Sequence, residues 1–469
     1  LSMSSWPDQT SVSLSGGSYG YRAADLGLEK SFSTWAYHLG VGKTEDKGNY
    51  PVKIGNNLNN RENNSYSQTW GKLQIRGILN KRISISTVTI MTDQNRGVAG
   101  SLDWLTPNSK KDDKLFLQSL SLGYALSKGY MKLQLSHRES YEIYDSPNDN
   151  PDWSIYSKHN LLTNGIKYIL STQIIPSIYF QSSSEWKEES INSTDAGIHK
   201  RNTISQAMRI TWSPIRKLSV TPAVRYDHAK DLYTEMNYDL KVSITGFKGS
   251  EFSAEIGTNY QHPSFNDLYW DDLGMVGNSE LKPEYSNFSK VKWEQAFDQG
   301  DFLSVSYTDR KSLDLIQWIS DETGWVWQSF NLAKTRRQNI IIFGKATLKV
   351  LPLSLQGHFT LLNTLDEEDG KPLLYTPDEI GNIGLHFDGK EIGWNLQLQY
   401  TGERRNTVSD NLNGFVCVSA NMFYRPPIYE NRFDITLVVE NLFRQNIQAF
   451  PGFPEPGRTF KLSLGYTQP

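Results

Sequence analysis

The chain has 469 residues, a formal net charge of −3 and a single cysteine, Cys417. This near balance of charge gives no indication of nucleic-acid binding, and one cysteine excludes a disulfide framework within the chain. A soluble protein of this length would be expected to divide into two or three domains, because one compact core rarely grows so large.

The hydrophobic content is too low and too scattered for a helical membrane protein. Hydrophobic residues make up 38% of the chain, and the mean hydropathy is −0.52. A membrane-spanning helix needs a predominantly apolar run of about 18 residues or more, and the sequence contains none. A transmembrane β-barrel needs no such run, because only alternate residues of its strands meet lipid. The aromatic content of 12% also suits a barrel.

The N-terminal part of the chain carries two motifs that resemble catalytic loops. Residues 16–20 (GGSYG) fit the G-x-S-x-G elbow of hydrolases, with Ser18 as the nucleophile, but that elbow needs a helix after its turn. Residues 21–32 instead alternate like a strand, so the glycine cluster favours a tight hairpin. Residues 42–44 (GKT) match the end of a phosphate-binding loop, but Tyr37 stands where that loop needs its first glycine.

Alternation of apolar and polar residues with a period of two recurs along the chain and predicts β-strands. Clear examples are residues 218–226, 353–361, 394–400 and 433–440. A helix cannot use this pattern, since its residues i and i+2 lie on opposite sides.

The connections between these strands alternate between short and long. Short turns are predicted near residues 79–82, 127–129, 170–173, 214–217, 247–250, 297–301 and 388–391. Longer polar stretches cover residues 44–64, 92–112, 141–156, 184–198, 262–283, 365–372, 403–413 and 444–457. Transmembrane barrels have short periplasmic turns and long extracellular loops. The sequence therefore predicts an all-β, 22-stranded antiparallel transmembrane β-barrel with both termini on the periplasmic side.

Aromatic residues lie near many of the predicted strand ends, where a barrel carries its aromatic girdles. Ordinary β-propensity explains part of this enrichment. The girdle candidates are Trp70, Tyr124, Tyr130, Tyr168, Phe180, Trp212, Tyr226, Tyr238, Tyr260, Trp293, Tyr400, Tyr424 and Tyr466.

The polar face of the strands must point into the lumen, because a charge facing lipid costs a few kcal/mol. A packed plug and a wetted lumen both explain its mixed charges. Cys417 belongs to this face and is expected to be inert. The other lumenal candidates are Lys132, Gln134, Arg209, Arg225, Lys241, Glu255, Asn259, Lys292, Glu294, Gln356, His358, Asn395, Gln397, Gln399, Asp434, Glu440 and Lys461.

Two segments resemble those of a known family, the TonB-dependent outer-membrane receptors. Residues 262–284 contain His-Pro-Ser-Phe-Asn-Asp-Leu-Tyr-Trp and then Gly-Asn-Ser-Glu-Leu-Lys-Pro-Glu, similar to a long extracellular loop of that family. Residues 438–466 contain ENLF, PGR and an alternating last strand, similar to the family's terminal hairpin. Residues 11–20 look like its first barrel hairpin, and the short loops look most similar to the vitamin B12 and small-siderophore branch.

The resemblance implies high-affinity import of a scarce nutrient, cobalamin or a ferric siderophore, across the bacterial outer membrane. TonB would supply the energy by pulling on an N-terminal plug through a short TonB box. On this prediction residues 1–10 are a remnant of the plug–barrel linker, residues 11–469 form the barrel, and the plug is absent. No signal peptide is recognisable at Leu1–Trp6. The last strand ends at Gln468 rather than at an aromatic residue, which puts efficient assembly in question.

The long outer loops are the expected ligand contacts. Aromatic, amide and imidazole groups suit a large amphipathic ligand such as a corrinoid or siderophore, although loop packing explains each residue equally well. The substrate-binding candidates are His262, Phe265, Asn266, Tyr269 and Trp270, with Trp104 and Trp153 as secondary ones.

No enzymatic activity, cofactor or metal site is predicted. The eight histidines show no metal-binding spacing, and the acidic run 366–370 lacks the alternating ligands of a calcium loop. The expected partners are TonB, outer-membrane lipid and lipopolysaccharide, and the small-molecule substrate, with the receptor acting as a monomer.

Three alternatives remain open at this stage. A passive, plugless porin-like channel would conduct in a lipid bilayer. A barrel hydrolase using Ser18 would react with a serine-directed phosphonate. A soluble sugar-binding β protein would need no detergent.

Overall fold

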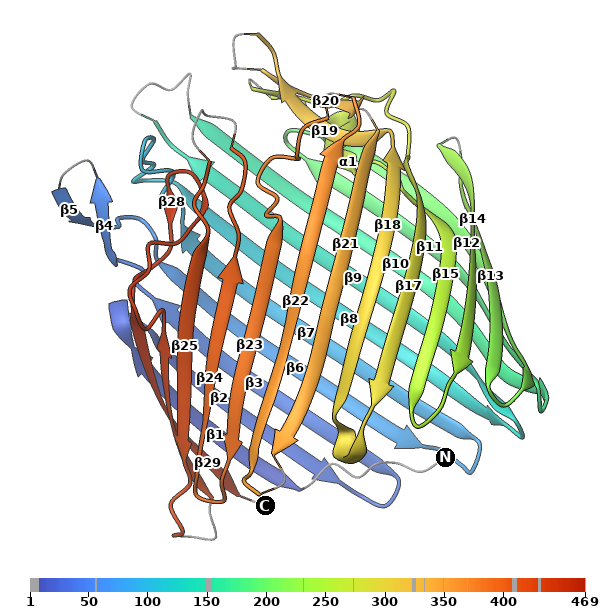
Figure 1. Ribbon diagram of the computed structural model, residues 1–469. Coiled ribbons are helices and arrows are strands. Elements are labelled where there is room, and N and C mark those ends of the chain that lie inside the picture. The colour runs from blue at the N-terminus through green and yellow to red at the C-terminus, as the bar shows by residue number, and fades with distance from the viewer. Residues whose placement is uncertain are drawn as a thin grey trace.

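The computed structural model describes residues 8–468, except 55–56, 149–153, 231, 273, 323–325, 333, 349, 369, 407–410 and 429–431. In this part of the chain, 22 antiparallel strands form one sheet that closes on itself (Figure 1). The barrel strands are β1 (Gln9–Gly17), β2 (Arg22–Ser31), β3 (Trp35–Asp46), β6 (Tyr66–Ile78), β7 (Ile83–Gly97), β8 (Lys110–Leu126), β9 (Gly129–Ser146), β10 (Ile155–Ile175), β11 (Ile178–Ser193), β12 (Gly197–Ile215), β13 (Leu218–Ala229), β14 (Tyr233–Thr245), β15 (Ser250–Gln261), β17 (Glu284–Ala296), β18 (Phe302–Leu313), β21 (Thr335–Leu348), β22 (Leu353–Asp366), β23 (Glu379–Asp388), β24 (Ile392–Thr401), β25 (Phe415–Tyr424), β26 (Phe433–Glu440) and β29 (Thr459–Gln468).

The barrel closes between its first and last strands. β1 pairs with β29 from Thr10 opposite Gln468 to Gly17 opposite Lys461, and the Oγ atoms of Ser15 and Ser463 are 2.8 Å apart across this seam. Closure removes the free edges that an open sheet would expose. The predicted 22-stranded antiparallel barrel is confirmed.

The connections segregate by length, as expected from the sequence. The start of β1, the end of β29 and most of the short turns lie at the lower end of the barrel in Figure 1, and the long loops project from the upper end. We call the upper end the mouth. The long loops carry two short hairpins, β4 (Pro51–Ile54) with β5 (Asn57–Asn60) and β27 (Gln448–Phe450) with β28 (Phe453–Pro454). They also carry a small sheet of β16 (Met275–Val276), β20 (Trp327–Leu332) and β19 (Leu315–Ser320).

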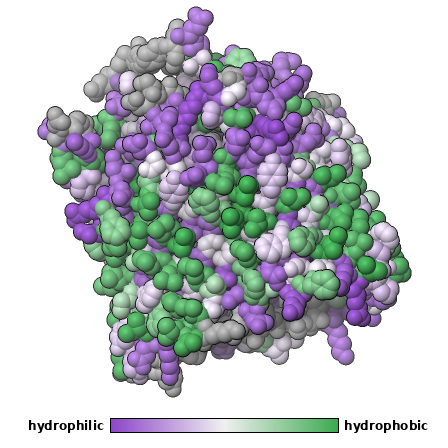
Figure 2. Space-filling view, in the orientation of Figure 1, coloured by the Kyte–Doolittle hydropathy of each residue, from purple (hydrophilic) through white to green (hydrophobic). Residues whose placement is uncertain are grey.

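Strand register separates an apolar outer face from a polar lumenal face. Leu464 pairs with Leu14 and with Ile435 on the outer face, and all three side chains are exposed. Figure 2 shows a broad hydrophobic band across one side of the barrel, below a hydrophilic rim at the mouth. Apolar side chains that face outward without protein contacts are suited to lipid. None of the described helices is long and apolar enough to span a membrane.

The lumenal face is polar and its charges pair across neighbouring positions. Lys461 lies 3.2 Å from Glu440, Lys167 lies 3.2 Å from Glu185, and Gln399 pairs with Cys417. The expected lumenal placement of Cys417 is therefore correct.

Two boundary predictions and two girdle predictions are wrong. Residues 170–173 lie inside β10, and the turn falls at 176–177. Residues 184–198 are almost entirely strand, because β11 and β12 continue as a polar hairpin above the apolar band. Trp70 faces the lumen, where its Nε1 donates to Asp25 Oδ1 at 3.2 Å. Tyr130 follows a lumenal register, opposite Ser171.

Candidate functional site

The loop predicted to bind ligand folds into the barrel mouth around a short helix, α1 (Phe265–Tyr269). Ser264 caps this helix, and its Oγ accepts a hydrogen bond from Asp267 N at 3.1 Å. Asp267 Oδ2 in turn accepts from Ser264 N at 2.9 Å, which completes a capping box. The Pro-Ser-Phe-Asn-Asp stretch of the family-like motif is therefore a helix start.

The apolar face of α1 packs against the lumenal side of the β11–β12 hairpin. Phe265 is buried with Ile191 and Ala196. The guanidinium of Arg201 lies 4.9 Å from the Phe265 ring centroid, and its Nη1 donates to Pro263 O at 3.1 Å. These contacts fix the loop across the opening.

Two histidines of the inner wall contact the aromatic residues that follow. Tyr269 stacks on His199, with ring centroids 3.6 Å apart and an interplanar angle of 6°. Trp270 lies 5.2 Å from the ring of His159, and its Nε1 donates to Asp272 Oδ2 at 3.0 Å. Tyr269 and Trp270 thus use much of their surface in packing.

His262 occupies a partly buried position at the base of this loop. Its ring stacks on Tyr233 at 5.1 Å. Burial, reinforced by the nearby cations of Arg201 and Lys187, lowers the pKa of His262 to about 4. The imidazole is therefore neutral at pH 7.

A second loop, residues 314–334, closes over α1. Trp318 Nε1 donates to Asp267 Oδ1 at 3.1 Å, and Ser329 Oγ donates to Asp267 O at 2.7 Å. Asn278 Nδ2 donates to Ser329 O at 3.2 Å. This loop was not predicted from the sequence, because its strands are short and its contacts are with distant residues.

The structure brings together most, but not all, of the predicted ligand-binding residues. Phe265, Tyr269 and Trp270 lie on α1 or at its end and pack against the inner wall. His262 precedes the helix and stacks on Tyr233, and Asn266 is exposed on the helix. Trp104 is 62% exposed on another loop, and no contact described here joins it to α1. Trp153 lies outside the described residues.

A pocket on another side of the mouth was missed from the sequence. It has a volume of about 600 Å³ and lies between the turn 18–21, the loop 47–65 and the loop 441–458. Its lining includes four tyrosines, so we call it the tyrosine pocket: Tyr19, Tyr21, Tyr50 and Tyr66. They are far apart in the sequence, and only the closure of β1 against β29 brings the first and last loops together.

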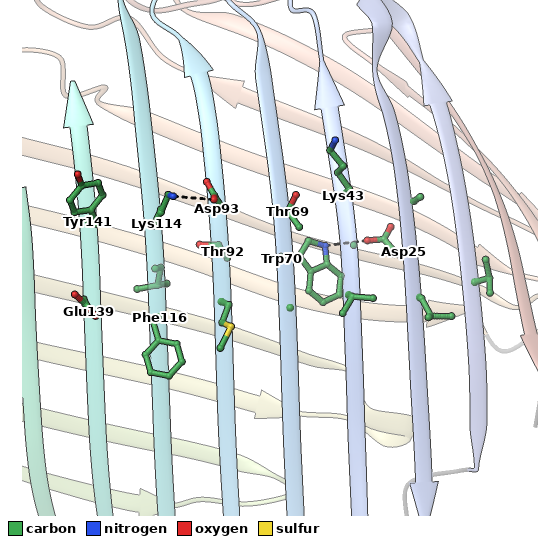
Figure 3. A pocket seen from close by; sticks show the side chains of 18 of the residues that line it. Asp25, Lys43, Thr69, Trp70, Thr92, Asp93, Lys114, Phe116, Glu139 and Tyr141 are labelled. Carbon is green, nitrogen blue, oxygen red and sulfur yellow. Dashed lines mark hydrogen bonds and ion pairs between the residues drawn. The ribbon is translucent and has the colours of Figure 1, made fainter. Parts of the chain in front are cut away.

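The larger depression shown in Figure 3, of about 1040 Å³, lies on the outer wall. Val41 and Met91 line it, and Gly71 between them leaves open space where a side chain would stand. In Figure 3, Lys43 and Lys114 lie along its upper edge. An apolar groove on the apolar face is suited to lipid rather than to a water-soluble ligand.

The two catalytic motifs do not form catalytic loops. Ser18 begins a single turn of 3-10 helix, η1 (Ser18–Gly20), between β1 and β2, and its Oγ accepts from Phe460 N at 2.9 Å. No helix follows, so the nucleophile elbow is not built. Residues 42–44 lie within β3. Among the described residues, no group of three or more His, Cys, Asp or Glu side chains is arranged to hold a metal ion.

The fold and the polar mouth define a receptor-type transmembrane barrel, and comparison with known proteins gives its family. The family model described as "TonB dependent receptor-like, beta-barrel" matches residues 4–442. The chain therefore belongs to the TonB-dependent receptor β-barrel family.

Two similar proteins are vitamin B12 transporters named BtuB. That of Vibrio vulnificus (strain YJ016) is 21% identical over 304 residues, covering 62% of this chain and 48% of the relative. That of Vibrio cholerae serotype O1 (strain M66-2) is 20% identical over 386 residues, covering 76% and 57%. The chain thus spans about half the length of these relatives.

Solved structures share the fold at low sequence identity. The copper transporter OprC has a TM-score of 0.82 at 14% identity, covering 98% of this chain and 80% of that one. The siderophore receptor PirA from Acinetobacter baumannii has a TM-score of 0.80 at 13% identity, covering 100% and 81%.

Proposed function

We propose that this barrel belongs to an outer-membrane receptor that imports cobalamin or a ferric siderophore with energy supplied through TonB. The observation that carries this proposal is membership of the TonB-dependent receptor family over residues 4–442. The similarity to vitamin B12 transporters supports a corrinoid, and the similarity in fold to siderophore receptors is compatible with a ferric chelate.

The mouth loops, the lumenal wall and the outer face of the barrel have different roles in this proposal. Loops at the mouth capture the ligand, and the polar lumenal wall offers a path that TonB opens by acting on a plug. The apolar outer face contacts lipid and lipopolysaccharide, and one chain closes the barrel, so the receptor works as a monomer. We retain His262, Phe265, Asn266, Tyr269, Trp270, Trp104 and Trp153 as proposed ligand contacts.

Uptake of labelled substrate by cells tests this proposal. Cells that carry the encoded receptor are offered radiolabelled cyanocobalamin or a ferric trihydroxamate, with and without TonB. Accumulation that requires both the receptor and TonB is the expected result. Accumulation that requires the receptor but not TonB would indicate passive diffusion rather than energised import. The absence of accumulation of either compound would reject the proposed substrates.

No catalytic step forms part of this function. The family is one of receptors, and the similar proteins are transporters. Ser18 does not lie on a nucleophile elbow.

A further inference from the structure

The tyrosine pocket is built from the two ends of the chain. Tyr19 and Tyr21 lie in the turn between β1 and β2, Tyr50 lies in the loop after β3, and Tyr66 begins β6. The rings of Tyr19 and Tyr50 are 5.9 Å apart at 61°. Pro454 roofs the pocket and accepts a hydrogen bond from Tyr50 Oη at 2.7 Å.

Tyr19 is held in a backbone conformation that favours glycine. Its φ is 56° and its ψ is 28°, in the left-handed region, which costs a non-glycine residue of order 1 kcal/mol or more. A hydrogen bond of 3.1 Å from Lys47 N to Tyr19 O holds the backbone in this conformation. In this conformation the Tyr19 ring lines the pocket.

The charged residues of the pocket leave it without a free cation. Lys461 lies 3.2 Å from Glu440 and 5.1 Å from the ring centroid of Tyr21. Arg96 lies 3.2 Å from Asp113. Both basic groups that line the pocket are therefore neutralised by carboxylates.

Two further carboxylates line the pocket. Asp46 Oδ1 accepts from Gly48 N at 2.7 Å, and Glu455 stands beside the roof. Among the described residues neither forms a direct ion pair, although Glu455 lies within electrostatic range of Arg404. The lining as a whole carries more negative than positive charge, which repels an anionic ligand and tolerates a neutral or cationic one.

We propose that the tyrosine pocket is a docking site for the substrate and that it selects amphipathic ligands with no net negative charge. Tyrosine faces contact flat or apolar parts of such a ligand and attract positive charge, and the carboxylates exclude polyanionic chelates. This inference rests on the proposed import function and narrows its substrate class.

Binding of three probes by the purified, intact receptor tests the charge selection. The probes are cyanocobalamin, a cationic ferric trihydroxamate and a triply anionic ferric tricatecholate, followed by quenching of protein fluorescence. We expect at least one of the first two to bind at least 100-fold more tightly than the tricatecholate. Tightest binding of the tricatecholate would overturn the inference.

Tyr19→Gly separates a ligand-binding role from a structural one. Glycine fits the left-handed backbone, so the variant loses the ring while relieving the strain. We expect the Kd for the preferred probe to rise at least tenfold while the melting temperature does not fall. The matched control is Lys248→Gly, which relieves a similar φ of 49° in a turn at the other end of the barrel and should leave Kd unchanged.

The outcomes also distinguish this inference from the proposed function. If wild-type cells import a probe and Tyr19→Gly binds that probe as tightly as wild type, the docking site is wrong and import stands. If wild type neither binds nor imports any of the probes, both fail.

Discussion

His262 is the residue whose charge state most directly affects the mouth loop. The cations of Arg201 and Lys187 oppose its protonation, while Glu189 and Asp227 favour it less strongly. The neighbouring Tyr233 ring stacks on it. Its folded-state pKa of about 4 lies below the ordinary value of 6.5.

This depressed pKa predicts that acid loosens the loop. Between pH 6.5 and 4 the unfolded loop binds more protons than the folded one, so stability falls as the pH falls. Stabilisation from this residue is complete above pH 6.5 and is lost by about pH 4. With an allowance for partial solvent exposure, we expect the loss to be about 1–2 kcal/mol.

Amide hydrogen exchange of residues 262–270 at pH 7 and pH 4.5, corrected for intrinsic rates, measures this loss. His262→Gln removes the titrating group and should abolish the pH dependence. Equal pH dependence in the variant and wild type would rule out His262 as the cause.

The aromatic pair Tyr269 and Trp270 at the end of α1 gives a second prediction at this scale. Tyr269→Ala and Trp270→Ala should each weaken ligand binding and uptake, because removal of the ring loosens contacts with His199 or His159. Truncation of a large packed side chain costs about 2–4 kcal/mol locally. Ligand affinity by fluorescence is the measurement.

Asn266→Ala is the companion variant, because this proposed ligand contact is exposed on the same helix and its loss leaves the packing intact. A loss in Asn266→Ala would indicate direct contact with the ligand, whereas losses confined to the aromatic variants would indicate an indirect effect through packing. Unchanged affinity in both aromatic variants would exclude the α1 cluster from ligand binding.

At the scale of elements, the seam between β14 and β15 is incompletely paired. Backbone pairing runs from Thr245 opposite Glu251 to Asp239 opposite Gly257 and then stops. Above that point side chains bridge the gap: Thr258 Oγ1 accepts from Tyr238 N at 3.1 Å and donates to Asn237 Oδ1 at 3.2 Å. The upper β13–β14 hairpin is thus joined to its neighbour mainly by side chains.

Thr258→Val should loosen this seam. The substitution keeps the shape and removes both hydrogen bonds, at an expected cost of about 1–2 kcal/mol. Hydrogen exchange in residues 233–238 should then accelerate about tenfold. Thr459→Val is the control, since Thr459 Oγ1 donates to Glu440 Oε2 at 2.8 Å where backbone pairing between β26 and β29 is continuous. Equal acceleration in β29 of that variant would show that the seam is not specially weak.

Strand boundaries show where sequence reasoning succeeds and fails at this scale. Alternation located β13, β22, β24 and β26 because their outward residues must be apolar. It failed at 184–198, since polarity marks the edge of the membrane and not the end of a strand, and β11 and β12 continue beyond that edge. These extensions have the polar composition of a loop, so their backbone pairing could not be predicted from the sequence.

The candidate site was predictable only in part for a related reason. The α1 segment was found because its motif is contiguous. The tyrosine pocket was not found, since Tyr19 and Pro454 meet only through the closure of the barrel. The sequence also could not show that Phe265 is used in packing, because an aromatic residue in a loop has the same signature in either role.

At the scale of the whole molecule, stability depends on keeping the two faces distinct. Leu464→Arg places a charge on the lipid face of the closing strand, which costs about 2–4 kcal/mol near the membrane midplane. Ser463→Arg, one residue away, points to the lumen and should cost about 1 kcal/mol for the lost bond to Ser15. Urea unfolding in lipid vesicles measures both. A larger cost for Ser463→Arg would reverse the assignment of faces on β29.

The carboxylate of Asp267 links two loops that are separate in the sequence. The carboxylate accepts hydrogen bonds from Ser264 N, which caps α1, and from Trp318 Nε1 of the loop 314–334. The backbone carbonyl of Asp267 accepts a hydrogen bond from Ser329 Oγ of the same loop. The two loops are thus one mechanical unit. An exchange of loops between receptors, made to change ligand specificity, will need to transfer residues 262–283 and 314–334 together. Either loop alone would lose the hydrogen bonds that Asp267 makes to the other.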